Sequence, residues 1–542
     1  MIKIKFTFLC AALHFVGFTQ VHFTEVSSQV GIDYHYPGND FQMAGGGVMI
    51  IDVNNDGWED LFQAGGVFDS KLWINKGGTF EDATTAFGLD VLSGYFIQGT
   101  VAADYDNDGF RDFIVANYGT GMSRGDKHAP VIMRNVKGKS FEMVNLDKVI
   151  APGNYSSACW GDVNKDGFAD VYLTNYVASM GGIQDSNGVE IGYDPECFEN
   201  KFLLNLGGKG FRECAAEYGF ADGGCGLSAS FTDADSDGDA DLLLLNDFGE
   251  WTGVGNKYFE NLYPQAKFID VTVEKGFENY MYGMGIGQGD YDGDADLDYY
   301  ITNIGKNYLY QNEGGVFKDV GTQLKIDATF VKDSIRGTSW SGLFFDADLD
   351  GDLDLYVSKG NVATLVPKTV IRDPNLFFLN ENGIFKDISS TSGVNDVLSH
   401  RGAAVFDFDH DGDLDLVSSV VKLPWAAFAK LDQKIKLYRN DSPHGNWIGI
   451  KLEDGQGMGK DCYGCRVIFE EKGKRMAKEV DAGSGQASQS SAILYYGLDS
   501  DKDLDTIRII WGDGTESTYS SLVSNAVYLI KKGAMPVPVK GR

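Results

Sequence analysis

Asp104-Tyr-Asp106-Asn-Asp108-Gly109 opens a short acidic loop, and the chain carries seven loops of this design. Each loop has Asp or Asn at positions 1, 3 and 5 and Asp at position 9. These residues are Asp52, Asn54, Asp56 and Asp60; Asp104, Asp106, Asp108 and Asp112; Asp162, Asn164, Asp166 and Asp170; Asp233, Asp235, Asp237 and Asp241; Asp290, Asp292, Asp294 and Asp298; Asp346, Asp348, Asp350 and Asp354; and Asp407, Asp409, Asp411 and Asp415. Oxygen ligands at alternate positions around a tight turn suit a hard cation of calcium size. The repeat therefore predicts up to seven calcium sites, one per loop.

The main-chain carbonyl at loop position 7 can supply a further oxygen to each ion. The residues at this position are Trp58, Phe110, Phe168, Asp239, Asp296, Asp352 and Asp413. An EF-hand would need Glu at position 12 and flanking helices. Position 12 here never holds Glu, and the flanking residues alternate as in strands. The loops are therefore predicted to join strands. Purely polar turns are the alternative, which an Asp at position 9 of every loop disfavours.

The fifth loop differs from the others at position 6, where Ala295 replaces glycine. This position is expected to need a positive φ, which glycine adopts at little cost. We therefore expect the fifth site to be the weakest or the most distorted.

Each loop belongs to a longer repeat that contains about four strand-like segments. One landmark is a strand that ends in Asn before a turn, as in Phe202-Leu-Leu-Asn205. Another is a strand opened by Phe, which occurs at six internal places but not after Asn440. Its seventh copy, Phe23-Thr-Glu-Val-Ser27, precedes every acidic loop. A ring in which this N-terminal strand completes the last unit leaves no open edge.

The sequence thus predicts an all-β fold, in which a seven-bladed β-propeller closed by the N-terminal strand is followed by a small all-β module. Beyond Asn440 the repeat stops, and segments such as Thr506–Trp511 alternate as strands do. The predicted domains are a signal peptide at 1–20, the propeller at 21–442, the C-terminal module at 446–532 and a tail at 533–542.

The acidic loops resemble the FG-GAP or VCBS repeats of integrin-α-like propellers. The C-terminal part resembles the ASPIC/UnbV domain. The motifs that carry the second resemblance are Asn446-Trp447, Gly464-Cys-Arg466-Val467, Gly483-Ser-Gly485 with Ser488-Gln489, Tyr496-Gly497-Leu498, and Asp505 with Trp511-Gly-Asp-Gly514. Cys465 and Gly512 depart from the expected pattern. The combination is similar to the cartilage acidic protein family and its bacterial relatives, which implies a secreted calcium-binding protein with an interaction role.

Charge and hydropathy restrict where the protein works. The chain has 46 Lys and Arg against 78 Asp and Glu, and its net charge of -32 argues against nucleic acid and anionic membranes as partners. Lys3 and Lys5 followed by an apolar stretch from Phe6 to Phe18 are typical of an export signal. No later segment is apolar for long enough to span a bilayer. We expect a secreted, periplasmic or cell-surface protein.

Six cysteines follow the predicted signal peptide, so disulfides are possible in an exported protein. Cys462 and Cys465 are close enough in sequence to form a local disulfide. Cys197 with Cys214 is a second candidate pair.

The leading functional hypothesis is an adhesion or ligand-binding module that recognises an extracellular protein or glycan. Candidate contacts are the insertion Ala178–Asn200 and the aromatic residues Tyr193, Trp251 and Trp425. The alternative is an enzyme, a lyase or hydrolase that acts on extracellular polysaccharide on a propeller scaffold. No catalytic motif supports it; His400-Arg401 is the most interesting basic pair. A third possibility is a purely structural surface component.

Overall fold

The computed structural model describes residues 21–35, 46–66, 68–119, 128–220, 222–328, 336–360, 372–421, 433–443, 445–454, 461–483, 485–498 and 504–539. The predicted signal peptide and Trp425 lie outside these ranges. Strands dominate the described residues. The helices are one-turn segments, namely η1 (Leu89–Leu92), α1 (Ala215–Tyr218), α2 (Gly249–Thr252), α3 (Gly321–Leu324) and α4 (Ser389–Ser392). No helix among the described residues is long and apolar enough to cross a membrane.

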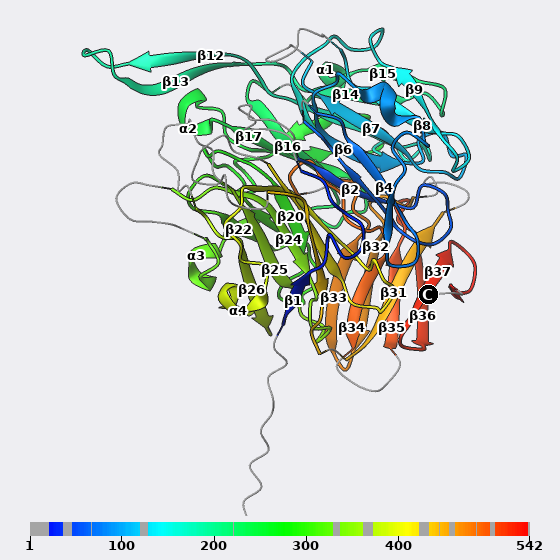
Figure 1. The fold of residues 1–542 in the computed structure, drawn as a ribbon. Helices are drawn as coiled ribbons and strands as arrows, with labels where there is room; N and C mark the ends of the chain where they lie inside the picture. The colour runs from blue at the N-terminus through cyan, green and yellow to red at the C-terminus, as the bar shows by residue number, and fades with distance from the viewer. Residues whose placement is uncertain are drawn as a thin grey trace, which may run out of the picture.

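Seven four-stranded antiparallel sheets form the repeat region within the described residues (Figure 1). The first six are β2 (Val48–Ile51), β3 (Asp60–Gln63), β4 (Lys71–Asn75) and β5 (Phe80–Asp82); β6 (Ile97–Ala103), β7 (Asp112–Asn117), β8 (Val131–Asn135) and β9 (Phe141–Asn145); β10 (Tyr155–Gly161), β11 (Asp170–Asn175), β14 (Lys201–Asn205) and β15 (Phe211–Glu213); β16 (Cys225–Thr232), β17 (Asp241–Asp247), β18 (Lys257–Asn261) and β19 (Phe268–Asp270); β20 (Ile286–Gly289), β21 (Asp298–Ile301), β22 (Tyr308–Asn312) and β23 (Phe317–Asp319); and β24 (Ser339–Phe345), β25 (Asp354–Lys359), β26 (Leu376–Glu381) and β27 (Ile384–Asp387).

The last sheet of the repeat region joins the two ends of that region. It contains β28 (His400–Phe406), β29 (Asp415–Val420), β30 (Lys436–Asn440) and the N-terminal strand β1 (Phe23–Glu25). Phe23 pairs with Asn440, so the expected pairing of the N-terminal strand is present. The first strands of neighbouring sheets contact one another in the order β2, β6, β10, β16, β20, β24 and β28, and β28 also contacts β2. The fold is therefore all-β and propeller-like.

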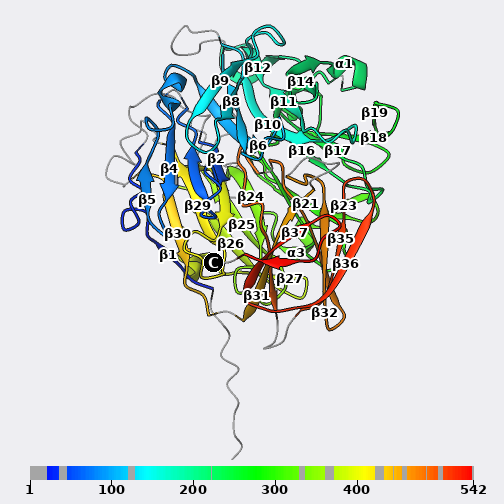
Figure 2. The same ribbon diagram turned by 90° about the vertical axis from the view of Figure 1, so that its right-hand side faces the viewer.

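The C-terminal region forms two further four-stranded sheets, which lie against one side of the repeat region (Figure 2). One contains β31 (Asn446–Glu453), β34 (Leu494–Leu498), β37 (Ala526–Lys531) and β38 (Val537–Pro538), and the other contains β32 (Arg466–Glu471), β33 (Lys474–Glu479), β35 (Leu504–Ile510) and β36 (Glu516–Leu522). β38 falls within the segment expected to be a loose tail and pairs with β37.

Residues 481–483 and 485–491, here called the axial segment, reach the first strand of all seven sheets. The hydrogen bonds are Ile50 N–H to Gln489 O (3.0 Å), Ala102 N–H to Gln489 Oε1 (2.7 Å), Trp160 N–H to Ala482 O (3.1 Å), Ser228 Oγ–H to Gly485 O (2.9 Å), Gly485 N–H to Ile286 O (2.5 Å), Gln486 N–H to Ser341 Oγ (3.3 Å) and Ser491 N–H to Val405 O (2.9 Å). A Cβ added at Gly47 would lie 2.1 Å from the Ala487 carbonyl oxygen. Close approach of this segment therefore explains why small residues precede the acidic loops.

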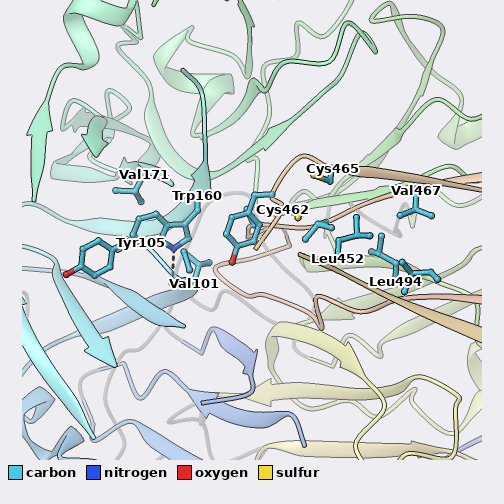
Figure 3. Packing of buried hydrophobic residues seen from close by; sticks show 14 of the residues in the cluster. Val101, Tyr105, Trp160, Val171, Leu452, Cys462, Cys465, Val467 and Leu494 are labelled. Carbon is cyan, nitrogen blue, oxygen red and sulfur yellow. Dashed lines mark hydrogen bonds between the residues drawn. The ribbon is translucent and has the colours of Figure 1, made fainter. Parts of the chain in front are cut away.

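A hydrophobic cluster joins the second and third sheets to the C-terminal region (Figure 3). Trp160 is fully buried there, and its indole N–H donates to the Val101 carbonyl at 3.1 Å. Leu452, Cys462 and Val467 belong to the same cluster. The two regions thus share one core, which favours a fixed arrangement over independent movement.

One disulfide is present among the described residues, but both candidate pairings were wrong. Cys197 at the end of β13 (Glu190–Cys197) bonds to Cys225 at the start of β16, because the hairpin of β12 (Val177–Gln184) and β13 returns beside that strand. Cys214 is a buried free thiol that packs in another cluster. Cys462 and Cys465 are also free and buried. Burial raises the pKa of the Cys462 thiol well above its usual range, which disfavours the reactive thiolate.

Asp247 at the end of β17 is a buried carboxyl group near the base of the hairpin. It accepts hydrogen bonds from the Tyr176 hydroxyl and from the Phe248 N–H. Burial raises the pKa of Asp247 to about 7, although both hydrogen bonds lower it. The folded protein therefore favours the protonated form, so stability is lost as the pH rises from the unfolded pKa towards 7.

Asp247→Asn should remove this pH dependence, because an amide still accepts the hydrogen bond of Tyr176 but does not ionise. Relative to the wild type, the variant should gain about 2–4 kcal/mol in free energy of unfolding between pH 4.5 and 7.5. Urea denaturation across this range measures the difference. A difference that does not change with pH would show that Asp247 is ionised in the folded protein throughout.

Candidate metal centres

Each acidic loop joins the first two strands of its sheet, as predicted. The position-9 aspartates Asp60, Asp112, Asp170, Asp241, Asp298, Asp354 and Asp415 open the second strands and are at most 1% exposed. In every case one carboxylate oxygen accepts the N–H of loop position 2, and the other accepts the N–H of an Asn at the end of the third strand, which in β26 is the last residue but one. In the first loop these bonds are Val53 N–H to Asp60 Oδ2 (3.0 Å) and Asn75 N–H to Asp60 Oδ1 (2.8 Å). The position-9 carboxylate therefore fixes the loop to two strands.

The position-1 carboxylate shapes the turn. In the second loop the Gly109 N–H donates to Asp104 Oδ2 at 2.8 Å, and the Phe110 N–H donates to Asp108 Oδ1 at 2.9 Å. The same bond from position 6 to position 1 occurs in the first six loops. These bonds turn the carboxylates at positions 1 and 5 towards the interior of the loop.

Five loops gather three carboxylates with oxygen atoms within 4.8 Å of one another. The groups are Asp104, Asp106 and Asp108; Asp233, Asp235 and Asp237; Asp290, Asp292 and Asp294; Asp346, Asp348 and Asp350; and Asp407, Asp409 and Asp415. The side chains at positions 1, 3 and 5 converge in the first four groups. In the last group the side chains at positions 1, 3 and 9 converge. The two other loops have an amide, Asn54 or Asn164, at position 3. The predicted side chains are thus brought together in most loops.

The electrostatics of these groups fit a bound cation. Burial and the neighbouring aspartates raise the pKa of Asp112 to about 9 and that of Asp350 to about 8. One side-chain oxygen of Asp239 and one of Asp348 are buried and have no hydrogen-bond partner. Clustered carboxylates repel one another, and hard oxygen donors match the ligand preference of calcium. The loops therefore fit a calcium-sized ion.

The fifth loop keeps this arrangement despite Ala295. Ala295 has φ 78° and its N–H donates to Asp290 Oδ2 at 3.0 Å, as glycine does at this position elsewhere. The position therefore needs a positive φ, as predicted, but the carboxylates of Asp290, Asp292 and Asp294 still converge. Weaker binding at this site stays a prediction.

Ala295→Gly should stabilise the protein by about 0.5–1 kcal/mol, because glycine adopts the left-handed conformation without the cost that a Cβ brings. The midpoint of urea denaturation measures this gain. A loss of stability would show that the methyl group, which is 5% exposed, contributes more through packing than it costs in backbone strain.

Sequence reasoning missed the role of the Asn that ends each third strand. Its side-chain N–H group donates to the position-2 carbonyl of the preceding loop around the cycle. The pairs are Asn75 with Phe408, Asn135 with Val53, Asn205 with Tyr105, Asn261 with Val163, Asn312 with Ala234, Asn380 with Tyr291 and Asn440 with Ala347. These bridging asparagines tie every loop to the next sheet, and Asn75 ties the first sheet to the last loop. Their recurrence in the sequence was visible, but their partners were not.

Asn205→Ala should lower the free energy of unfolding by about 2–4 kcal/mol, because it removes the side-chain donor of the buried Tyr105 carbonyl and of the partly buried Ala169 carbonyl, each 2.9 Å from Asn205 Nδ2. Gln265→Ala, at an exposed amide, is the control and should change stability by less than about 0.5 kcal/mol. Equal effects of the two substitutions would contradict the bridging role.

The C-terminal region contacts the position-1 aspartates directly. Asp290 Oδ2 accepts the Ala477 N–H at 2.8 Å, and Asp346 Oδ2 accepts the Gly497 N–H at 3.0 Å. Asp407 Oδ2 accepts the Tyr495 hydroxyl at 3.1 Å. Docking of this region therefore orients carboxylates of three loops.

Charged side chains add to the same interface. The Arg466 side chain is 3% exposed. Its Nη2 atom lies 3.6 Å from Asp233 Oδ2 and 4.0 Å from Glu479 Oε2. Arg111 pairs with Asp461 at 2.7 Å, and Asp461 also accepts the Asp104 N–H. The C-terminal region thus places the cation Arg466 beside the fourth loop and the carboxylate Asp461 beside Arg111 of the second loop.

Comparisons with known proteins identify both parts of the chain. The family model for FG-GAP-like repeats matches residues 52–115, 104–173 and 290–357, and the ASPIC and UnbV model matches residues 455–536. The chain therefore carries FG-GAP-like repeats followed by an ASPIC and UnbV domain.

Over most of its length the chain is similar to Cartilage acidic protein 1. It is 22% identical to the Mus musculus protein over 521 residues, which cover 91% of this chain and 74% of that protein. It is 25% identical to the Xenopus tropicalis protein over 531 residues, which cover 92% of this chain and 74% of that protein. The predicted resemblance is thus confirmed.

Among solved structures, a lectin from Agrocybe aegerita that recognises non-reducing terminal N-acetylglucosamine matches with 18% identity and a TM-score of 0.38. The match covers 65% of this chain and 82% of the lectin. A TM-score of this size carries no inference about the ligand of this chain.

Proposed function

We propose that the chain is a secreted or cell-surface, calcium-binding β-propeller of seven blades that acts as an adhesion or ligand-binding module. The proposal assigns residues 1–20 to a signal peptide, 21–442 to the propeller, 446–532 to the ASPIC/UnbV domain and 533–542 to the tail. The cyclic order of contacts between first strands and the place of β1 in the last sheet support this blade count.

Each loop is proposed to hold one calcium ion through the side chains at positions 1, 3, 5 and 9 and the carbonyl at position 7. The observation that carries this proposal is the convergence of three carboxylates in five loops. Bound calcium supplies positive charge that offsets the repulsion among these groups. Its role is mainly structural, because the loops lie between strands and several of them contact the docked C-terminal region.

The surroundings of the first strands disfavour an active site there. The axial segment already contacts the first strand of every sheet, where a substrate would otherwise enter a propeller. His400 and Arg401, the basic pair considered for catalysis, are both fully buried in β28. The His400 ring is hydrogen-bonded through Nδ1 to Ser418 Oγ at 2.8 Å and through Nε2 to Asp396 Oδ1 at 2.7 Å. The observations therefore favour a binding module over a polysaccharide lyase or hydrolase.

The partner is proposed to be an extracellular protein or glycan, and binding arrays test this. The purified mature protein should give saturable binding to at least one glycan or matrix protein, and excess chelator should abolish it. Absence of any saturable ligand would contradict the proposal and favour a purely structural component. Release of sugar products in a parallel polysaccharide digestion would favour the enzyme.

A further inference from the structure

The β12–β13 hairpin, residues 177–197, forms an arm that extends away from the sheets (Figure 1). Every described residue of β12 after Val177 is exposed. A lone two-stranded hairpin is only marginally stable in water. The arm therefore needs support from the rest of the protein.

Two contacts hold the arm, one at its base and one farther along β13. The Cys197–Cys225 disulfide ties the end of β13 to the first strand of the fourth sheet. The Tyr193 ring packs against Trp251 at 5.1 Å between centroids, and Trp251 stacks on the buried Phe248 at 5.6 Å. An arm ordered in advance loses less conformational entropy when a partner binds.

The outer edge of β12 is suited to pairing with another strand. Among the described residues no strand pairs with it other than β13. Natural edge strands are usually protected by charged residues or proline. The sequence of β12 contains neither, whereas β13 contains Pro195. Gly181 and Gly182 also leave room for a partner backbone to approach.

The charge of the arm indicates what kind of strand would bind. Between residues 177 and 197 there are four acidic residues, Asp185, Glu190, Asp194 and Glu196, and no Lys, Arg or His. The exposed apolar side chains Met180 and Ile183 add contact area. A second copy of this chain, with its net charge of -32, is electrostatically disfavoured as the occupant.

We propose that the free edge of β12 binds an extended, Lys- or Arg-rich segment of a protein partner by strand addition. Main-chain hydrogen bonds would give affinity, and the carboxylates of β13 would select for basic side chains. The inference rests on the proposed binding function and names one element that performs it.

Fluorescence anisotropy with a labelled peptide of alternating Lys and Val tests the proposal on the full mature protein in calcium. The peptide should bind saturably, and an alternating Glu and Val peptide should not. The double variant Asp194→Asn/Glu196→Gln should bind about tenfold more weakly, because both carboxylates are exposed on β13, opposite Gly181 and Ser179 of β12 and within reach of long basic side chains on an added strand. The matched control Glu274→Gln/Glu313→Gln removes two exposed carboxylates elsewhere and should leave affinity unchanged.

A Lys and Val peptide that is N-methylated at every residue separates strand addition from simple charge attraction, because methylation then removes the main-chain donors on both edges of the peptide. Loss of binding supports the proposal, whereas unchanged binding overturns it. Equal weakening in the two double variants also overturns it. If no basic peptide binds but the arrays find a saturable ligand, the arm proposal fails and the proposed function stands.

Discussion

Removing calcium from the purified protein should lower its thermal midpoint by about 10–20 °C. Each ion that binds only the folded state adds about 2.7 kcal/mol to the free energy of unfolding when the free calcium concentration is a hundredfold above the dissociation constant. Several such sites act on one cooperative unit, because bridging asparagines join each loop to the next sheet. Without the ions, the clustered carboxylates must either repel or take up protons. Differential scanning calorimetry in calcium and in excess chelator measures the shift.

Magnesium provides the control for this experiment. It demands a smaller, near-octahedral shell and keeps several of its waters, so it should restore only a minor part of the lost stability. Full recovery in magnesium would contradict sites of calcium size. A midpoint that does not change in chelator would contradict a structural role for the ions altogether.

Arg466→Ala should lower the free energy of unfolding by about 3–5 kcal/mol, because it leaves buried carboxylates without their cation. Arg466 lies between Asp233 and Glu479, and its guanidinium also donates to Ser236 Oγ at 2.7 Å. Burial raises the pKa of Glu479 to about 7 even with Arg466 beside it. Urea denaturation in calcium measures the loss.

Two further variants separate charge from lost packing. Arg466→Met with Glu479→Gln removes the pair together and should recover much of the stability that Arg466→Ala loses. Arg134→Ala removes an arginine that is 42% exposed and paired with Glu142, and should cost less than about 1 kcal/mol. If Arg466→Ala proves as mild as Arg134→Ala, the interface with the acidic loops does not depend on this cation.

The sequence predicted the repeat unit well because the physical requirements are local. A loop that turns between two strands needs its oxygens at alternate positions and a positive φ at position 6, so both appear as a fixed spacing. The sequence also placed the N-terminal strand Phe23–Glu25 in the last sheet, because only the last repeat unit lacked an outer strand.

What the sequence did not reveal depends on contacts between distant segments. The side chain of Asn205 crosses to Tyr105, a hundred residues earlier, and a strand ending in Asn does not say which carbonyl it will reach. Cys197 bonds to Cys225 because the hairpin returns there, which sequence spacing does not fix. The docking of the C-terminal region on the loops leaves no periodic pattern, so Arg466 could be noted only as part of a motif.

The calcium content of the purified protein tests the central claim most directly. After dialysis in calcium and rapid gel filtration, elemental analysis should find at least five and up to seven calcium ions per chain, in line with five converged carboxylate groups in seven loops. A content of one ion or none per chain would contradict the account.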